Sequence, residues 1–193
     1  GVGQHPGSDE CDDLLRLQTL LDIPINPSEN FTLFERAELP FDVQNLPDIF
    51  SQFRKRVEHQ SPRPAIPAPQ AFSHNICADK SNCVLDKWCA DLSQQRAANP
   101  PHRHTLAFTG GSKAGAEQLH FYLHGSHKIA TYKETRNQLE GWDFSSKLSP
   151  WLALGCISAR QVAEAINHYE REQQANESTY WLYFELLWRE YFQ

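Results

Sequence analysis

Residues 144–150 bring three serine hydroxyls and one lysine to the expected start of a helix, with Ser149 as its cap and Pro150 in its first position. The first amides of a helix have no partner within it, and the positive end of the helix dipole attracts anions. The hydroxyls and the charge of Lys147 add to that attraction. The segment therefore predicts either a phosphate site or a capped helix with nothing bound.

A second candidate lies on the helix expected over the last residues of the chain. Spacings of four, three and four place four side chains on one face: Trp181, Glu185, Trp188 and Phe192. A carboxylate between two indoles is unusual in a core, and burying it without a partner is costly. Glu185 therefore needs a partner, which can be Arg189 one turn later, a ligand or water. The face is either a ligand wall or one side of an aromatic core helix.

Histidines and cysteines raise the question of a metal site. His120 and His124 are one helical turn apart, but the glutamate of a His-Glu-x-x-His pattern is missing between them. Cys77, Cys83 and Cys89 are spaced by six residues, whereas zinc-binding pairs are spaced by about two to four. We therefore expect no metal site.

The composition allows a folded domain but gives nucleic acid no overall attraction. The 193 residues are 40% hydrophobic, and the formal charge is -6. A DNA contact must therefore come from a local patch, and residues 128–160 hold five basic against three acidic side chains.

No stretch approaches the ~20 consecutive apolar residues of a membrane helix. The cysteine count of five is odd and does not suggest a disulfide scaffold. We expect a soluble intracellular protein, cytoplasmic in a bacterium, with an organelle or the nucleus also open in a eukaryote.

The elements that must position these residues are helical. Pro47 is expected to start a helix with Phe50, Phe53 and Val57 on its apolar side, after an extended stretch over residues 31–41. Six of the twelve prolines fall in residues 61–104, which predicts a long irregular connection with a short helix over 83–95. Residues 1–29 are expected to be a linker or the tail of a domain.

Further helices are expected over residues 112–124 and 128–137. A Ser-x-x-Gln capping box from Ser158 to Gln161 predicts the start of the next one. Spacings of three, four and seven then give that helix one apolar face: Val162, Ala165, Ile166 and Tyr169. No strand alternation stands out, so the predicted class is all-α.

Several motifs in this order resemble the photolyase and cryptochrome family, and its DASH-type branch in particular. They are Thr-Tyr-Lys-Glu-Thr-Arg-Asn at 131–137, Ser-Ser-Lys-Leu-Ser at 145–149, Trp-Leu-Ala-Leu-Gly-Cys-Ile-Ser at 151–158, Ser-Thr-Tyr-Trp at 178–181 and Tyr-Phe at 191–192. The resemblance is strong over residues 106–192 and fainter over 31–57. It lapses at residues 124–127, where the family usually has a more aromatic segment.

The resemblance implies the first part of a helical FAD-binding domain, preceded by a long irregular connector. Residues 1–45 would be a linker or the tail of an α/β antenna domain, 46–104 a helix plus a proline-rich connector, and 105–193 the truncated FAD domain. The antenna domain, outside this chain, can bind a folate-type pigment. The helical pattern stops at Gln193 without a cap, so the chain is expected to be an excerpt.

By the same resemblance, seven residues would contact FAD: Tyr132, Ser145, Ser146, Lys147, Leu148, Ser149 and Arg189. Glu185 and Trp188 would be the catalytic residues facing a flipped-out pyrimidine dimer, and Arg136 would lie near the DNA backbone. The anion site expected at residues 144–150 thus coincides with the phosphate site of the family.

The implied activity is FAD-dependent, blue-light-driven repair of cyclobutane pyrimidine dimers by a monomeric carbon–carbon lyase. Its partner would be dimer-containing DNA, single-stranded or with the dimer flipped out. A blue-light photoreceptor without repair activity stays open, because sensors of the family can retain Glu185 and Trp188. A helical interaction domain without flavin is the third alternative. The chain alone is expected to be inactive.

Overall fold

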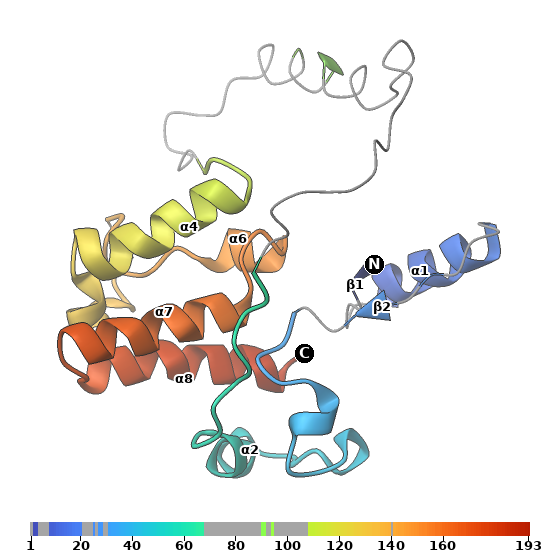
Figure 1. Ribbon diagram of the computed structural model, residues 1–193, viewed down its shortest axis with the longest axis horizontal. Coiled ribbons are helices and arrows are strands. Elements are labelled where there is room, and N and C mark those ends of the chain that lie inside the picture. The colour runs from blue at the N-terminus through green and yellow to red at the C-terminus, as the bar shows by residue number, and fades with distance from the viewer. Residues whose placement is uncertain are drawn as a thin grey trace. The chain divides into compact units, whose positions relative to one another are not determined.

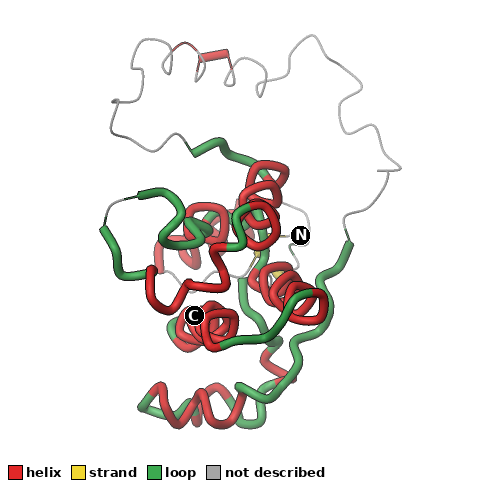
Figure 2. Tube along the Cα trace, turned by 90° about the vertical axis from the view of Figure 1, so that its left-hand side faces the viewer, coloured by secondary structure: helices red, strands yellow, loops and turns green. Residues whose placement is uncertain are grey.

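The computed structural model describes residues 2–3, 8–20, 25, 27–28, 31–67, 90–91, 94, 108–139 and 141–193. The chain divides into two compact units. The first comprises Gly1–Ala65 together with Gly110–Gln193, and the second comprises Ile66–Thr109. All helices and strands named below belong to the first unit. The described residues are almost entirely helix and loop (Figure 2).

The α-helices are α1 (Ser8–Leu20), α2 (Phe50–Val57), α4 (Ser112–His120), α5 (Tyr132–Thr135), α6 (Ser149–Ala153), α7 (Ala159–Glu172) and α8 (Glu177–Tyr191). The described residues also include the 3-10 turns η1 (Arg36–Glu38), η2 (Val43–Asn45) and η5 (Lys128–Thr131) and the π turn η4 (Phe121–Gly125). The two-residue strands β1 (Val2–Gly3) and β2 (Pro27–Ser28) form a parallel pair. The all-α prediction is therefore confirmed.

Helices α7 and α8 lie side by side, and α2 and α5 pack against α8 (Figure 1). The predicted capping box begins α7: Ser158 Oγ accepts from the Gln161 amide at 3.1 Å, and Gln161 Oε1 accepts from the Ser158 amide at 2.8 Å. Of the predicted apolar face, only Ala165 is half-exposed. The buried side chains of α7 are Ala159, Val162, Ala163, Ile166 and Tyr169.

Helix α8 begins at Glu177, three residues before Tyr180, where the helical pattern in the sequence starts. Asn176 caps it, because its Oδ1 accepts from the amides of Ser178 at 2.8 Å and Thr179 at 2.9 Å. The cap satisfies amides that the first helical turn leaves without a partner. Leu182, Leu186 and Leu187 then form its apolar side in the core.

Helix α2 begins at Phe50 and not at Pro47, which corrects the sequence-based start. The Pro47 carbonyl accepts a hydrogen bond from the Tyr191 hydroxyl at 3.1 Å, and the residues up to Ile49, the cap, are not helical. The apolar stripe itself is confirmed, since Phe50, Phe53 and Val57 are all buried.

The helix expected over residues 112–124 changes character at Phe121. Helix α4 ends at His120, and η4 closes a wider turn in which the Ser126 amide donates to the Phe121 carbonyl at 2.7 Å. Such π turns are rare and often lie at functional sites. The helical piece expected over residues 128–137 is found as η5 followed by α5.

Ser149 is not the cap of α6, which corrects a second prediction. The helix begins at Ser149 itself, and Leu148 is its cap residue, without a side-chain hydrogen bond to the helix. The side chain of Leu148 is only 2% exposed, whereas Ser149 is exposed. Lys147 has a φ of 57°, a left-handed conformation that turns the chain before the helix.

Within the segment expected to be a linker or the tail of a preceding domain, residues 8–20 form helix α1. The apolar run from Leu14 lies on α1, where Leu15, Leu17 and Leu20 are exposed. Residues 31–41 are bends around η1 and not an extended stretch, and the helix expected over 83–95 lies outside the described residues apart from the helical 90, 91 and 94.

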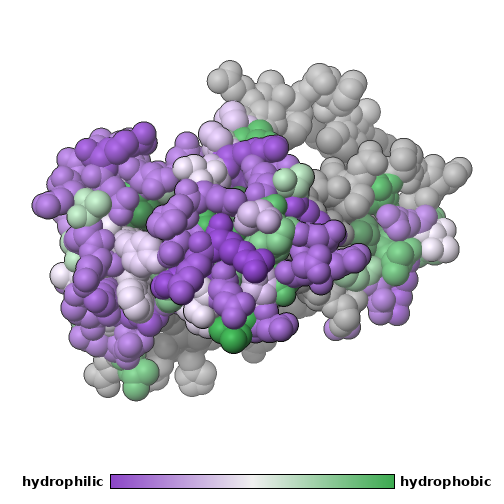
Figure 3. Space-filling model, turned by 90° about the horizontal axis from the view of Figure 1, so that it is seen from below, coloured by the Kyte–Doolittle hydropathy of each residue, from purple (hydrophilic) through white to green (hydrophobic). Residues whose placement is uncertain are grey.

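None of the helices that the structure describes is long and apolar enough to cross a bilayer. Seen from below, the surface is mostly hydrophilic, with separate hydrophobic spots (Figure 3). The buried apolar side chains lie where α8 packs against α2, α5 and α7, and where α7 packs against α4 and η4.

Candidate functional site

The site is built where α5 meets α8. The Arg136 guanidinium of α5's end pairs with the Glu185 carboxylate in the middle of α8 and lies 5.4 Å from the centre of the Trp181 ring. Glu185 thus finds its partner on another helix and not in Arg189, the residue one turn later. Their side chains are 27% and 32% exposed, so the pair lies at the edge of solvent.

Tyr132 lies at the start of α5, beside this pair, and its side chain is buried. Burial, reinforced by the charge of Glu185, raises the pKa of Tyr132 to about 12, against an opposing effect of Arg136. The Tyr122 ring meets the Tyr132 ring edge-on, with ring centres 6.3 Å apart. Tyr132 is therefore a neutral phenol whose ring is held by packing.

The first turn of α8 holds this arrangement in register. The buried Ser178 Oγ accepts from the Lys133 amide at 3.1 Å and donates to Glu134 Oε2 at 3.0 Å. Asn176 Nδ2 donates to the Ala130 carbonyl at 3.3 Å. The residues that cap α8 thus also fix the backbone on either side of Tyr132.

Residues 145–149 are attached to the same body through the backbone. The Ser146 carbonyl accepts from Gln118 Nε2 of α4 at 3.1 Å, and the Phe144 carbonyl accepts from Thr135 Oγ1 at 2.9 Å. Ser145, Ser146 and Lys147 are half-exposed, and Ser149 is exposed. Four of the five predicted phosphate-binding residues therefore present polar groups to solvent, while Leu148 anchors the loop in the core.

Trp188 lies on the same face of α8 as Glu185 but has different neighbours. Its ring stacks on Phe50 of α2, with centres 3.5 Å apart at 15°, and lies parallel to the Phe192 ring at 5.7 Å. Trp181 instead stacks with Phe184 at 4.9 Å. The predicted stripe is therefore real, but the structure pairs Glu185 with α5 and Trp188 with α2.

Arg189 faces the segment that follows Asn30. Its guanidinium donates to the Phe31 carbonyl, and burial lowers its pKa. The contact occupies one of the five N–H groups of the guanidinium.

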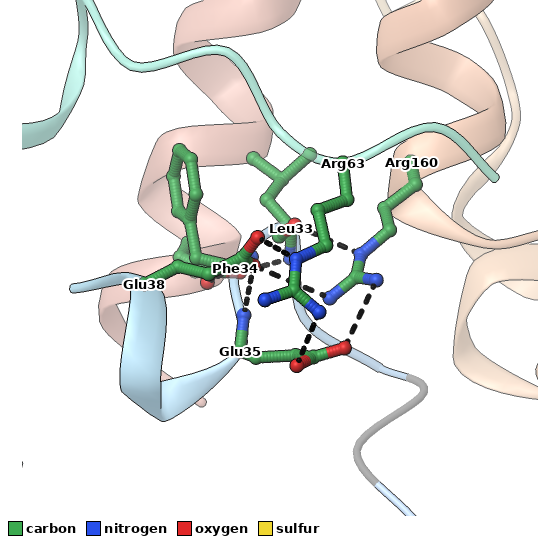
Figure 4. Close-up of polar contacts among 7 residues, drawn as sticks. Leu33, Phe34, Glu35, Glu38, Arg63 and Arg160 are labelled. Atoms are coloured by element: carbon green, nitrogen blue, oxygen red, sulfur yellow. Dashed lines mark hydrogen bonds and ion pairs between the residues drawn. The ribbon is translucent and has the colours of Figure 1, made fainter.

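Glu190 is a buried acidic residue that the sequence analysis did not single out. Its two carboxylate oxygens accept from the amides of Leu33 at 2.7 Å and Phe34 at 3.1 Å, and its pKa is raised by burial. Arg160 Nε donates to the Leu33 carbonyl at 2.9 Å (Figure 4). A signal was available, because Glu190 follows Leu182 and Leu186 at spacings of four, on the buried side of α8.

Two arginines form ion pairs with two glutamates of the segment 31–38. Arg63 lies 3.1 Å from Glu35 and 2.6 Å from Glu38, and Arg160 lies 3.6 Å and 3.8 Å from the same carboxylates (Figure 4). Together with the Glu190 contacts, this network ties residues 31–38 to α7 and α8.

In the described part of the chain, no three His, Cys, Asp or Glu side chains are arranged to hold a metal ion.

No protein-family model matches the chain. Among curated proteins it is 40% identical over 182 residues to a protein named cryptochrome DASH from Synechocystis sp., covering 93% of this chain and 36% of the relative. It is 42% identical over 163 residues to cryptochrome DASH of Xenopus laevis, covering 83% of this chain and 31% of the relative. The chain thus spans about a third of the length of these relatives.

Two solved structures have a similar fold. A cryptochrome of Synechocystis sp. superposes with a TM-score of 0.79 at 38% identity, over 98% of this chain and 39% of that one. A bacterial class III photolyase of Agrobacterium tumefaciens gives a TM-score of 0.64 at 19% identity, over 98% and 38%, which supports the fold alone. With the sequence relatives, these structures show that the chain belongs to the photolyase and cryptochrome family, in its DASH-type branch.

Proposed function

We propose that the full-length protein is an FAD-dependent, light-driven DNA photolyase of the DASH type, which repairs cyclobutane pyrimidine dimers. One observation carries the proposal: the half-exposed Glu185 carboxylate is paired with Arg136, whose guanidinium lies beside the Trp181 ring, and its charge acts on the buried phenol of Tyr132. The sequence relatives, which are named cryptochrome DASH, support the family on which this proposal rests. Because this chain spans about a third of them, the activity is proposed for the whole protein.

The cofactor side of the site is proposed to comprise Tyr132, residues 145–149 and Arg189. The donor set suits a dinucleotide with two phosphates, because three hydroxyls and the Lys147 ammonium face solvent around one turn of the backbone. Arg189 can contribute through the N–H groups that the Phe31 carbonyl does not use. When bound, FAD supplies light absorption and the electron that splits the dimer.

The substrate side is proposed to comprise Arg136, Glu185 and Trp188. Glu185 can accept a hydrogen bond from a pyrimidine edge, and Arg136 holds its carboxylate in place and can meet a DNA phosphate. Trp188 offers an aromatic edge, but its stacking on Phe50 means that it also supports α2. Trp188 therefore combines a packing role with the proposed contact to a base.

The partner is proposed to be single-stranded DNA, or DNA with the dimer flipped out, and the protein is proposed to act as a monomer. The kinds of side chain present support a DNA contact, although each cation also has a carboxylate partner, Glu177 for Lys133 and Glu185 for Arg136. Lys133 Nζ lies 5.5 Å and the Arg136 guanidinium 5.4 Å from the centre of the Trp181 ring, so two cations and an indole share one surface. Cationic and aromatic side chains together suit a single strand, because they bind the backbone and stack on bases.

The test is a repair assay with the flavin-loaded, full-length protein on a dimer-containing oligonucleotide, in light and in darkness. We expect loss of dimers only in light, and faster loss from single-stranded than from double-stranded DNA. Glu185→Gln should lower the repair yield, whereas Glu164→Gln on the exposed side of α7 should not. A flavin-loaded protein that repairs nothing in light would contradict the proposal and favour the photoreceptor alternative.

A further inference from the structure

Four histidines gather where η4 meets α7. The His124 ring lies in η4, and its centre is 5.1 Å from that of His120 and 6.1 Å from that of His168. His127 follows in the chain, in a left-handed conformation with a φ of 53°, and its ring lies 6.2 Å from the Tyr169 ring. The cluster is assembled from α4, η4, the residue before η5, and α7.

One carboxylate accompanies these four imidazoles. Glu172 Oε2 lies 3.3 Å from His168 Nδ1 and 3.9 Å from His124 Nδ1. The groups that face His124 are thus His120 on α4, His127 in the next turn, and His168, Tyr169 and Glu172 on α7. If the histidines take up protons, Glu172 can compensate only part of the positive charge.

His124 is the most enclosed member, with a side chain 25% exposed against 57% for His168. Burial lowers the pKa of His124, and the neighbouring His120 lowers it further, while Glu172 opposes them. The neutral imidazole is therefore the form that the folded structure favours. The His124 ring stacks on the His120 ring, and its centre lies 5.6 Å from that of the Tyr169 ring. These contacts disfavour a positive charge on His124.

We propose that His120, His124, His127 and His168, with Glu172, form a pH-sensitive latch that holds η4 on α7 while His124 is neutral and loosens when His124 is protonated. A histidine is the side chain whose ordinary pKa makes such a change possible between pH 5 and 8. In the chain, η4 is followed by η5 and then by Tyr132, the first residue of α5. Its role in flavin or DNA binding would rest on the proposed function, but the latch itself does not.

The direction of the pH effect follows from linkage. Because folding lowers the pKa of His124 below its ordinary 6.5, the unfolded or opened state binds the proton more tightly. The contribution of His124 to the closed latch is complete above pH 6.5 and is lost as the pH falls through the lowered pKa. Acid should therefore open η4 and the residues after it, while α2, on another side of α8, stays protected.

The test is hydrogen exchange of the full-length protein, followed by mass spectrometry at about pH 7.5 and about pH 5.5, on either side of the ordinary histidine pKa. After correction for the intrinsic exchange rate, we expect residues 121–131 to exchange faster at the lower pH by up to about tenfold, because pH 5.5 lies about one unit below the ordinary histidine pKa. A chelator in all buffers keeps transition metals out of the cluster.

Two variants and a control decide the outcome. His124→Gln should abolish the acid-induced increase, and His168→Gln, at a more exposed position that should not disturb folding, should reduce it. His59→Gln, whose side chain is 90% exposed outside the cluster, should keep it. Equal corrected exchange at both pH values, an increase that survives in His124→Gln, or an effect that requires added metal would overturn the proposal.

Discussion

Arg136 and Glu185 come from different elements and remain partly exposed, at 27% and 32%. Pairs at that exposure usually add about 1 kcal/mol or less to stability, because water competes for both charges. The pair therefore contributes little to the fold, and its main effect is to set the position of the carboxylate next to Tyr132. At the scale of single residues, the charges of Glu185 and Arg136 set the electrostatic environment of the buried Tyr132 phenol.

Replacing Glu185 by glutamine should lower the pKa of Tyr132 from about 12, because the charge of Glu185 is one of the causes of the increase and Arg136 would then act without its partner. The pKa can be followed by nuclear magnetic resonance of the labelled tyrosine ring carbon. The free energy of unfolding should change by about 1 kcal/mol or less. Glu164→Gln serves as the control, and an unchanged pKa of Tyr132 in Glu185→Gln would show that the two groups do not interact.

Glu190, unlike Glu185, contributes mainly to the stability of the fold. Glu190→Ala leaves the amides of Leu33 and Phe34 without their acceptor. Each buried amide left unpaired costs about 1–3 kcal/mol, partly offset because a buried charge is removed. We expect a loss of about 2 kcal/mol in the free energy of unfolding, measured by urea denaturation. A loss no larger than that of the exposed-site control Glu164→Ala would contradict this role.

At the scale of elements, the start of α8 does two separate tasks. Asn176 caps the helix through Oδ1 and binds the Ala130 carbonyl through Nδ2. Aspartate keeps the first contact and cannot donate the second, whereas alanine loses both. The two substitutions can therefore separate helix stability from the attachment of the segment before Tyr132.

We expect Asn176→Ala to lower the free energy of unfolding by about 1 kcal/mol or more, the usual contribution of an N-cap. Asn176→Asp should preserve most of that stability but increase hydrogen exchange in residues 128–134, because the Ala130 contact is lost. Denaturation and exchange measurements on the same samples give both quantities. If the aspartate variant exchanges like the wild type, the Nδ2 contact does not hold the segment.

Local signals in the sequence predicted most of these elements. The capping box at Ser158 and the stripe of Phe50, Phe53 and Val57 depend on spacings of three and four, and the structure confirms both. Helix α6 starts one residue earlier than the Ser-Pro pattern predicts, with Leu148, which has no capping side chain, as its cap residue. The π turn after α4 has no periodic signature.

The site residues show the same division. The helical spacing in α8 correctly put Glu185 and Trp188 on one face, but it could not identify Arg136 and Phe50 as their partners, because those contacts join segments far apart in sequence. Motif resemblance assigned the roles of residues 145–149 and Arg189, and these roles stay predictions. The predicted boundaries after residues 45 and 104 also stay predictions.

At the scale of the whole molecule, the chain spans about a third of its DASH-type relatives. It carries one wall of the proposed site, so the 193-residue chain alone should bind FAD more weakly than about 1 μM, a Kd that corresponds to roughly 8 kcal/mol of binding free energy. A fluorescence titration of FAD with the isolated chain checks this. Micromolar or tighter binding would mean that the described residues hold the cofactor without another wall.

Whether residues 145–149 hold FAD is tested most directly by the Kd for FAD of the full-length protein and its Lys147→Gly variant. Glycine removes the ammonium but suits the left-handed φ of 57°, so the loop keeps its shape. Losing a charge-assisted hydrogen bond of about 1.5–3 kcal/mol should weaken binding by about tenfold or more. A full-length protein that binds no FAD, or a variant that binds it as tightly as the wild type, would contradict the proposed cofactor site.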